Sequence, residues 1–145
     1  MATKNKTITF FTPKTTSGNG AILIDAGISA GFPSPADDFK ETRISLDDEL
    51  ITNKEATFFA KVSGQSMIGA GLDDNDLLVI DRSLEPENNK IAVCFLEGEF
   101  TVKRLRVEGD NVWLQPENPN YPVIKITEET DLVIWGIVTS VIKKV

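Results

Sequence analysis

A serine in a glycine-bearing turn is the first candidate for chemistry. Ser66 stands in the run Ser63-Gly64-Gln65-Ser66-Met67, which follows a predicted strand over 57–62 and precedes a loop with two further glycines. A serine that leaves a strand through such a turn is exposed, and neighbouring backbone N–H groups can point toward an oxyanion. Taken alone, the pattern also fits an ordinary turn serine. The chain has no histidine, so the group that activates Ser66 must be a carboxylate or a lysine.

Lys103 is a candidate for that activating group. It lies in a predicted strand over 99–107, where the period of two places it on one face with Thr101, Leu105 and Val107. The other face carries Phe100, Val102, Arg104 and Arg106. A mid-strand lysine between apolar neighbours can be desolvated, which lowers its pKa and lets the neutral amine act as a base. The alternative, which periodicity alone favours, is a lysine that extends from a strand edge into solvent.

Composition excludes several other kinds of site. Without histidine the chain cannot form a Ser-His-Asp triad or a Cys-His dyad, and a single cysteine excludes an internal disulfide. That residue, Cys94, lies in an apolar strand and is expected to be a buried hydrophobic residue rather than a nucleophile. The run Asp73-Asp74-Asn75-Asp76 begins like a calcium loop but lacks the required glycine, so we expect a solvated turn. The sequence predicts neither a metal nor a cofactor.

The charge distribution separates the first 30 residues from the rest of the chain. The 145 residues carry a formal net charge of −7, yet residues 1–30 hold three lysines and one aspartate. An acidic body argues against direct binding of nucleic acid, because affinity for phosphates needs a basic surface. No apolar run reaches the ~18 residues of a membrane-spanning helix, and the polar N-terminus shows no signal peptide. The expected compartment is the cytoplasm, without membrane association.

The elements that would position these residues are mainly strands. Runs rich in Val, Ile, Phe and Trp, separated by turn residues, predict strands over 57–62, 77–81, 91–96, 99–107, 112–115, 123–126 and 132–145. Helix signals are confined to 45–51, where Ser45 is a potential N-cap, and to a start near Ser66. Short, closely spaced strands predict a mainly β class with a compact, barrel-like or folded sheet.

The first 30 residues are expected to form an arm. Thr, Ser, Asn, Gly and Lys dominate residues 1–30, interrupted by the apolar runs 8–11 and 21–24. Such a segment can dock as a strand or two but is poorly suited to folding alone. Two prolines in the following run, Gly31-Phe32-Pro33-Ser34-Pro35, keep that stretch extended. We predict a flexible N-terminal arm over 1–30 and a body over 31–145.

Four motifs together resemble one family, the self-cleaving LexA/UmuD proteins of the bacterial SOS response, which are S24-type peptidases. The motifs occur in the family's order and spacing, and the resemblance covers about residues 28–143. They are the runs Ala30-Gly31-Phe32-Pro33-Ser34-Pro35-Ala36, Ser63-Gly64-Gln65-Ser66-Met67, Asp76-Leu77-Leu78-Val79-Ile80-Asp81 and Gly98-Glu99-Phe100-Thr101-Val102-Lys103-Arg104-Leu105. The resemblance implies a compact, strongly curved β-fold like that of LexA and the signal peptidases.

The resemblance also implies a Ser-Lys dyad that hydrolyses one peptide bond in the chain's own arm. Ser66 would be the nucleophile and Lys103 the neutral general base. The scissile bond would be Ala30-Gly31, where a small residue followed by glycine lets an extended backbone approach closely. The oxyanion would be held by the backbone N–H of Ser66 or Met67. Cleavage would remove residues 1–30 and leave the body 31–145.

The partners implied by the resemblance are those of SOS mutagenesis. They are a homodimer, a RecA filament on single-stranded DNA that stimulates cleavage, a UmuC-like subunit of an error-prone translesion polymerase, and the sliding clamp as a candidate. Thirty polar residues cannot supply the helix-turn-helix domain that a LexA-type repressor carries before its cleavage site. Two alternatives stay open: a soluble Ser-Lys peptidase that acts on other proteins, and a non-enzymatic interaction module in which the dyad residues are a coincidence.

Overall fold

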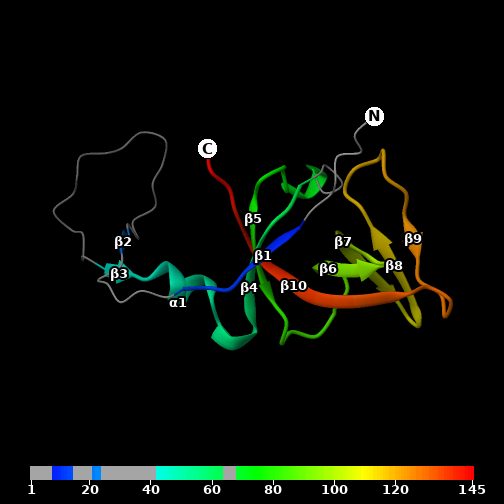
Figure 1. Cartoon of the computed structure of the whole chain (residues 1–145), viewed down its shortest axis with the longest axis horizontal. Coiled ribbons are helices and arrows are strands. Elements are labelled where there is room, and N and C mark those ends of the chain that lie inside the picture. Colours follow the sequence, from blue (N-terminus) through cyan, green and yellow to red (C-terminus); the bar gives the residue numbers. More distant parts are fainter. Residues whose placement is uncertain (1–7, 15–20, 24–41, 64–67) are drawn as a thin grey trace. The chain divides into compact units, whose positions relative to one another are not determined.

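The computed structural model describes residues 8–14, 21–23, 42–63 and 68–145 (Figure 1). The chain divides into two compact units. One combines Met1–Pro13 with Asn53–Val145, and the other is Lys14–Thr52. The first apolar run of the predicted arm therefore belongs to the same unit as the body's strands.

One antiparallel sheet of eight strands forms the first unit, in the order β1-β4-β5-β10-β6-β7-β8-β9. The strands are β1 (Thr9–Phe11), β4 (Thr57–Lys61), β5 (Leu77–Asp81), β6 (Ile91–Leu96), β7 (Glu99–Glu108), β8 (Asn111–Gln115), β9 (Ile124–Lys125) and β10 (Leu132–Ile142). Those from β4 to β10 fall on the predicted runs, and the predicted mainly β class is confirmed.

Short elements make up the second unit and the connections. In the second unit β2 (Ala21–Leu23) pairs with β3 (Thr42–Ile44), and α1 (Leu46–Leu50) follows. Ser45 caps α1 as predicted, because its hydroxyl accepts a hydrogen bond of 3.4 Å from the Asp48 N–H. Single 3₁₀ turns, η1 (Lys54–Ala56) and η2 (Ile68–Ala70), flank β4 in sequence. The second predicted helix appears only as η2, and its predicted start near Ser66 lies outside the described residues.

A two-residue turn fixes the register of β6 against β7. Leu96 pairs with Glu99, so Glu97 and Gly98 alone connect the strands. Both have positive φ, 48° and 81°. This left-handed pair matches the right-handed twist of a hairpin, which is why glycine is suited to the second position. The register continues without a shift to the pair Ala92 and Lys103.

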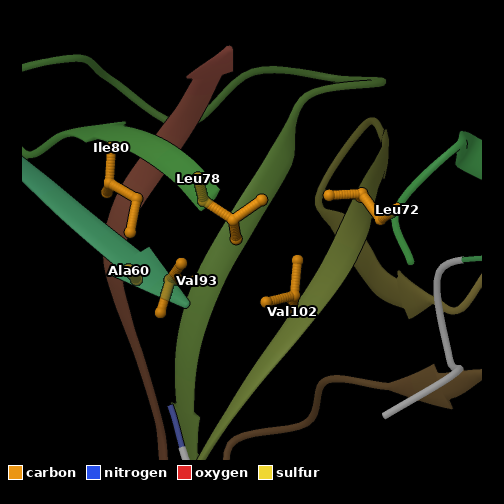
Figure 2. Close-up of a cluster of buried hydrophobic side chains, with 6 residues drawn as sticks. All are labelled: Ala60, Leu72, Leu78, Ile80, Val93 and Val102. Carbon is orange, nitrogen blue, oxygen red and sulfur yellow. The ribbon is translucent and has the colours of Figure 1, made fainter. Parts of the chain in front are cut away.

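The sheet buries side chains on both of its faces. The first cluster consists of Ala60, Leu72, Leu78, Ile80, Val93 and Val102 (Figure 2). The second consists of Ala92, Cys94, Leu105, Leu114 and Ile137. Consecutive residues of β6 alternate between the two, as a strand buried on both faces requires. Because paired residues point the same way, Lys103 shares the face of Ala92 and the second cluster.

Irregular pairing in β10 directs Trp135 toward the first cluster. Ile134 pairs with Cys94 and Gly136 with Val93, so Trp135 is an extra residue between them. Trp135 packs against the first cluster, whereas Ile134 packs against the second. Gly136 has no room for a side chain, since an added Cβ would lie 2.5 Å from Cγ2 of Ile80. The bulge thus lets Trp135 point into the first cluster, while the next residue, Gly136, must remain without a side chain.

Candidate active site around Lys103

The structure describes only one member of the predicted dyad. Lys103, which is that member, lies in β7. Ser66 and Met67 lie outside the described residues, as do Ala30 and Gly31 of the predicted scissile bond. The contact between Ser66 and Lys103 therefore remains a prediction. The described part of the site consists of the surroundings of Lys103 and the two ends of the serine loop.

Lys103 is buried within an interior strand. Its strand lies between β6 and β8, and the residue is only 6% exposed. The interpretation of Lys103 as a lysine that extends from a strand edge is therefore wrong, and desolvation is the better description. The Tyr121 ring lies near the amine, with its centroid 5.6 Å from Nζ. Burial penalises a charged amine, and this effect acts in the direction that a general base needs.

Cys94 occupies the same face and behaves as a buried hydrophobic residue. It is fully buried in the second cluster. Burial raises the pKa of its thiol to about 12, although the positive charge of Lys103 opposes that rise. The thiolate, which is the reactive form, is therefore scarce at neutral pH.

We expect the Cys94 thiol to resist alkylation in the folded protein. At pH 8 iodoacetamide should modify it at least about a hundredfold more slowly than in urea-unfolded protein, because about 12 lies far above the ordinary pKa of the thiol. Intact-mass measurement of the alkylated fraction over time gives both rates. Rapid modification under native conditions would contradict the burial of this face.

Backbone hydrogen bonds hold both ends of the loop that contains Ser66. Before the loop, the carbonyl of Val62 accepts a hydrogen bond of 3.0 Å from the Asn75 N–H. After it, the Gly69 N–H donates to the carbonyl of Glu117 at 2.9 Å. The approach at Gly69 is so close that an added Cβ would overlap the Glu117 carbonyl oxygen. Glycine is required here because backbone packs directly on backbone.

An ion pair connects the second of these anchors to the strand of Lys103. Nε of Arg104 donates to the Glu117 carboxylate, and the two side chains are 27% and 25% exposed. Arg104 also donates to the carbonyl of Asn89 at 2.7 Å. Glu117 thus binds the residue after Lys103 through its side chain and Gly69 through its backbone. The sequence analysis assigned no role to Arg104, Glu117 or Gly69, since nothing in the sequence pairs a strand arginine with a distant loop.

Glu117→Gln is expected to slow the predicted self-cleavage by about three- to tenfold, because this reaction needs the serine loop to be aligned with the strand of Lys103. The amide keeps the shape of the side chain but loses the charge that strengthens the hydrogen bond from Arg104. The matched control is Glu108→Gln, because Glu108 pairs with Arg106 at 3.8 Å on the same strand, with side chains 65% and 50% exposed. Exposed pairs of that kind contribute little. Equal cleavage rates for the two variants, followed by intact mass, would contradict the positioning role of Glu117.

Lys143 binds two carboxylates of the turn that resembles the start of a calcium loop. Nζ of Lys143 contacts the carboxylates of Asp73 and Asp76, each at 2.6 Å. Burial by itself would raise the pKa of Asp76, but hydrogen bonds from Lys143 and from the Asp73 N–H, with the charge of Lys143, lower it overall. Among the described residues no group of His, Cys, Asp and Glu is arranged to hold a metal ion. The turn is a closed ion-pair cluster that joins β5 to the end of β10.

Comparison with known proteins now places the chain in a family. Residues 22–139 match the family described as Peptidase S24-like. The chain belongs to the S24-like peptidase family. The matched range includes Ala30, Gly31, Ser66 and Lys103. No helix among the described residues is long and apolar enough to span a membrane.

Individual members of the S24-like family align over most of the chain. Protein MucA of Salmonella typhimurium is 42% identical over 113 residues, which are 77% of this chain and 77% of that protein. Protein ImpA of Escherichia coli is 40% identical over 115 residues, 79% of this chain and 78% of that protein. The LexA repressor of Acidithiobacillus ferrooxidans is 35% identical over 119 residues, 80% of this chain and 58% of the repressor. The predicted resemblance to the LexA/UmuD family is confirmed.

Proposed function

We propose that this S24-like protein is a UmuD-like serine endopeptidase that cuts its own Ala30-Gly31 bond with a Ser66-Lys103 dyad. The observation that carries the proposal is the burial of Lys103 on an interior strand, at 6% exposure, where desolvation penalises the charged form of the amine. A lysine used only for surface charge has no reason to occupy such a position. Membership in a peptidase family supports the assignment of a hydrolytic role.

The proposed reaction proceeds in two steps, formation of an acyl-enzyme ester and its hydrolysis. The neutral amine of Lys103 accepts the hydroxyl proton of Ser66 as the serine oxygen attacks the carbonyl carbon of Ala30. The backbone N–H of Ser66 or Met67 stabilises the oxyanion. The bond to the Gly31 nitrogen then breaks, and Lys103 returns the proton to that leaving amine. Water, deprotonated by Lys103, next attacks the acyl-enzyme ester, which frees the carboxylate of Ala30 and restores Ser66.

The anchors of the serine loop support this pairing of residues. Ser66 is three residues from Ser63 and three from Gly69, so covalent geometry keeps it within about 11 Å of each. Gly69 is bonded to Glu117, which is paired with Arg104, the neighbour of Lys103. A short path of hydrogen bonds therefore runs from Gly69, which follows the serine loop, to the strand of Lys103. Catalysis by proximity depends on fixed geometry of this kind.

The proposed setting is SOS mutagenesis in the cytoplasm. MucA, ImpA and LexA are relatives of this chain, which supports a UmuD-like role. A RecA filament on single-stranded DNA would stimulate cleavage by selecting the conformer whose arm lies in the site. The processed body 31–145 would then act as a homodimer with a UmuC-like subunit of a translesion polymerase, with the sliding clamp as a further partner.

The test is an intact-mass time course of the purified chain at pH 7 and about pH 10, with and without RecA, nucleotide and single-stranded DNA. Alkaline pH increases the neutral fraction of a lysine amine, so unaided cleavage should accelerate. One new species that begins at Gly31, absent from Ser66→Ala, is the expected result. An intact chain under every condition would overturn the proposal and favour a non-enzymatic interaction module. Equal cleavage of unrelated peptides would favour a peptidase that acts on other proteins.

A further inference from the structure

The N-terminal strand β1 covers what would otherwise be an edge of the sheet. It pairs antiparallel with β4 through Thr9 and Lys61, Phe10 and Ala60, and Phe11 and Phe59 (Figure 1). In the strand order β1 lies outermost, next to β4. Without β1, one side of β4 would present unpaired backbone N–H and C=O groups, which are a template for another strand.

Alternate side chains of this segment pack into an aromatic cluster on one face of the sheet. Ile8 and Phe10 pack against the first core cluster. The Phe10 ring lies 4.4 Å from the Trp135 ring and 4.9 Å from the Phe100 ring, centroid to centroid. Phe11, the next residue, is 46% exposed. The segment is therefore recognised through an aliphatic residue and an aromatic residue two positions later.

The aromatic cluster is assembled without the help of β1. The Trp135 ring contacts the Phe58 ring at 5.1 Å, and the guanidinium of Arg82 lies 4.4 Å from its centroid. Nε of Arg82 also donates to the carbonyl of Trp135 at 2.9 Å. These partners belong to residues after 31, so the receiving surface has contacts of its own that do not involve β1.

We propose that the β4 edge and the rings of Phe58, Phe100 and Trp135 form a strand-binding site that the chain's own residues 8–11 mask. Once those residues leave, the site accepts an extended peptide of a partner protein with an aliphatic residue and an aromatic residue in the places of Ile8 and Phe10. Pairing of backbones supplies affinity in such strand addition, and the pockets for alternate side chains supply specificity.

The covalent connection between residues 8–11 and the rest of the chain explains how masking of the site can be both complete and reversible. While residues 8–11 belong to the same chain, their effective concentration at the site is about millimolar, so even a weak strand stays docked. A three-residue pairing is too short to hold strongly by itself. The trigger rests on the proposed function: residues 8–11 lie within 1–30, the segment that cleavage at Ala30-Gly31 would separate from the body. The binding site itself requires no cleavage.

The experiment compares Phe10→Asp with the matched control Phe11→Asp in the full chain. Both carry Ser66→Ala to prevent processing and Trp113→Phe to leave Trp135 as the sole tryptophan. The probe is a synthetic peptide of residues 6–13. Phe10→Asp should expose β4, so the amides of 57–61 that face β1 should exchange hydrogen at least tenfold faster. The peptide should bind this variant and shift the Trp135 emission, but leave Phe11→Asp and the unsubstituted chain unchanged.

Three further measurements keep the test decisive. Circular dichroism shows that each variant is folded, and Phe10→Ala repeats the comparison without a charge. A peptide that itself carries Phe10→Asp should not bind. Equal exchange and equal emission for the two aspartate variants would overturn the proposal, whether or not the chain cleaves itself. Concentration-dependent dimers that form with Phe10→Asp but not with Phe11→Asp, in place of peptide binding, would also overturn it, because the occupant would be a second copy.

Discussion

Replacing Lys103 by methionine is expected to slow self-cleavage by at least about 10³-fold, because the Ser66 hydroxyl loses the group that accepts its proton. Methionine suits the position, since its flexible apolar side chain can pack on the face shared with Cys94 and Leu105. The intact-mass time course measures the rate at which the species beginning at Gly31 appears. Lys125→Met on β9, which β8 separates from the strand of Lys103, is the control and should cleave at the natural rate.

Lys103→Arg separates the role of base from the role of positive charge. Arginine retains the charge but does not give up its proton at accessible pH, so this variant should also be inactive. The natural chain should cleave faster as pH rises, because deprotonation creates the base, whereas Lys103→Met should show no such rise. A Lys103→Arg chain that cleaves at the natural rate would contradict the base role and assign Lys103 an electrostatic one.

The strands of the body were predictable because local and global signals agree in them. β5 and β6 are continuous apolar runs bounded by turn residues, and their predicted and observed limits coincide. The turn Glu97-Gly98 fixes one hairpin through its own positive φ values. The sequence pattern does not predict the bulge at Trp135, which breaks the period of two. At the bulge, an added Cβ on Gly136 would lie 2.5 Å from Ile80, and sequence periodicity does not encode this close approach between strands.

The site was predictable only in part, for a related reason. Periodicity placed Lys103 on the correct face with Leu105, but it favoured a lysine at a strand edge. Whether a strand is interior depends on the strands that join it, here β6 and β8, which come from other parts of the sequence. The anchor formed by Gly69, Glu117 and Arg104 is likewise long-range. Family motifs supplied roles for Ser66 and Lys103 that the residue pattern alone had left open.

The docking of the N-terminal segment likewise combines a local feature that the sequence predicts with a long-range pairing that it does not. The sequence indicates that the apolar run 8–11 can dock as a strand, and β1 is that strand. Its neighbour could not be named in advance, because β4 offers an edge only after the order of the whole sheet is set. Local sequence therefore specifies which segments extend, and the assembled sheet specifies where they pair.

Gly69→Ala is expected to slow self-cleavage about a hundredfold while it changes stability little. The added Cβ would overlap the Glu117 carbonyl oxygen, so the segment after the serine loop must move away and the Gly69 hydrogen bond must lengthen. A displacement of about 1 Å in a catalytic group can cost 10²-fold in rate. Gly69 itself is exposed, so most of the packing of the core is retained.

Gly136→Ala is the informative counterpart, because it adds the same methyl group in a place that should affect only stability. Its Cβ would lie 2.5 Å from Ile80, in the first core cluster, and overpacking of this kind costs about 1–3 kcal/mol. Urea denaturation and the intact-mass time course should therefore give opposite patterns for the two variants: lost activity at Gly69, lost stability at Gly136. If Gly69→Ala cleaved at the natural rate with its full stability, the serine loop would not depend on the Glu117 anchor, and the path from Ser66 to Lys103 would have to be set by residues 63–67 alone.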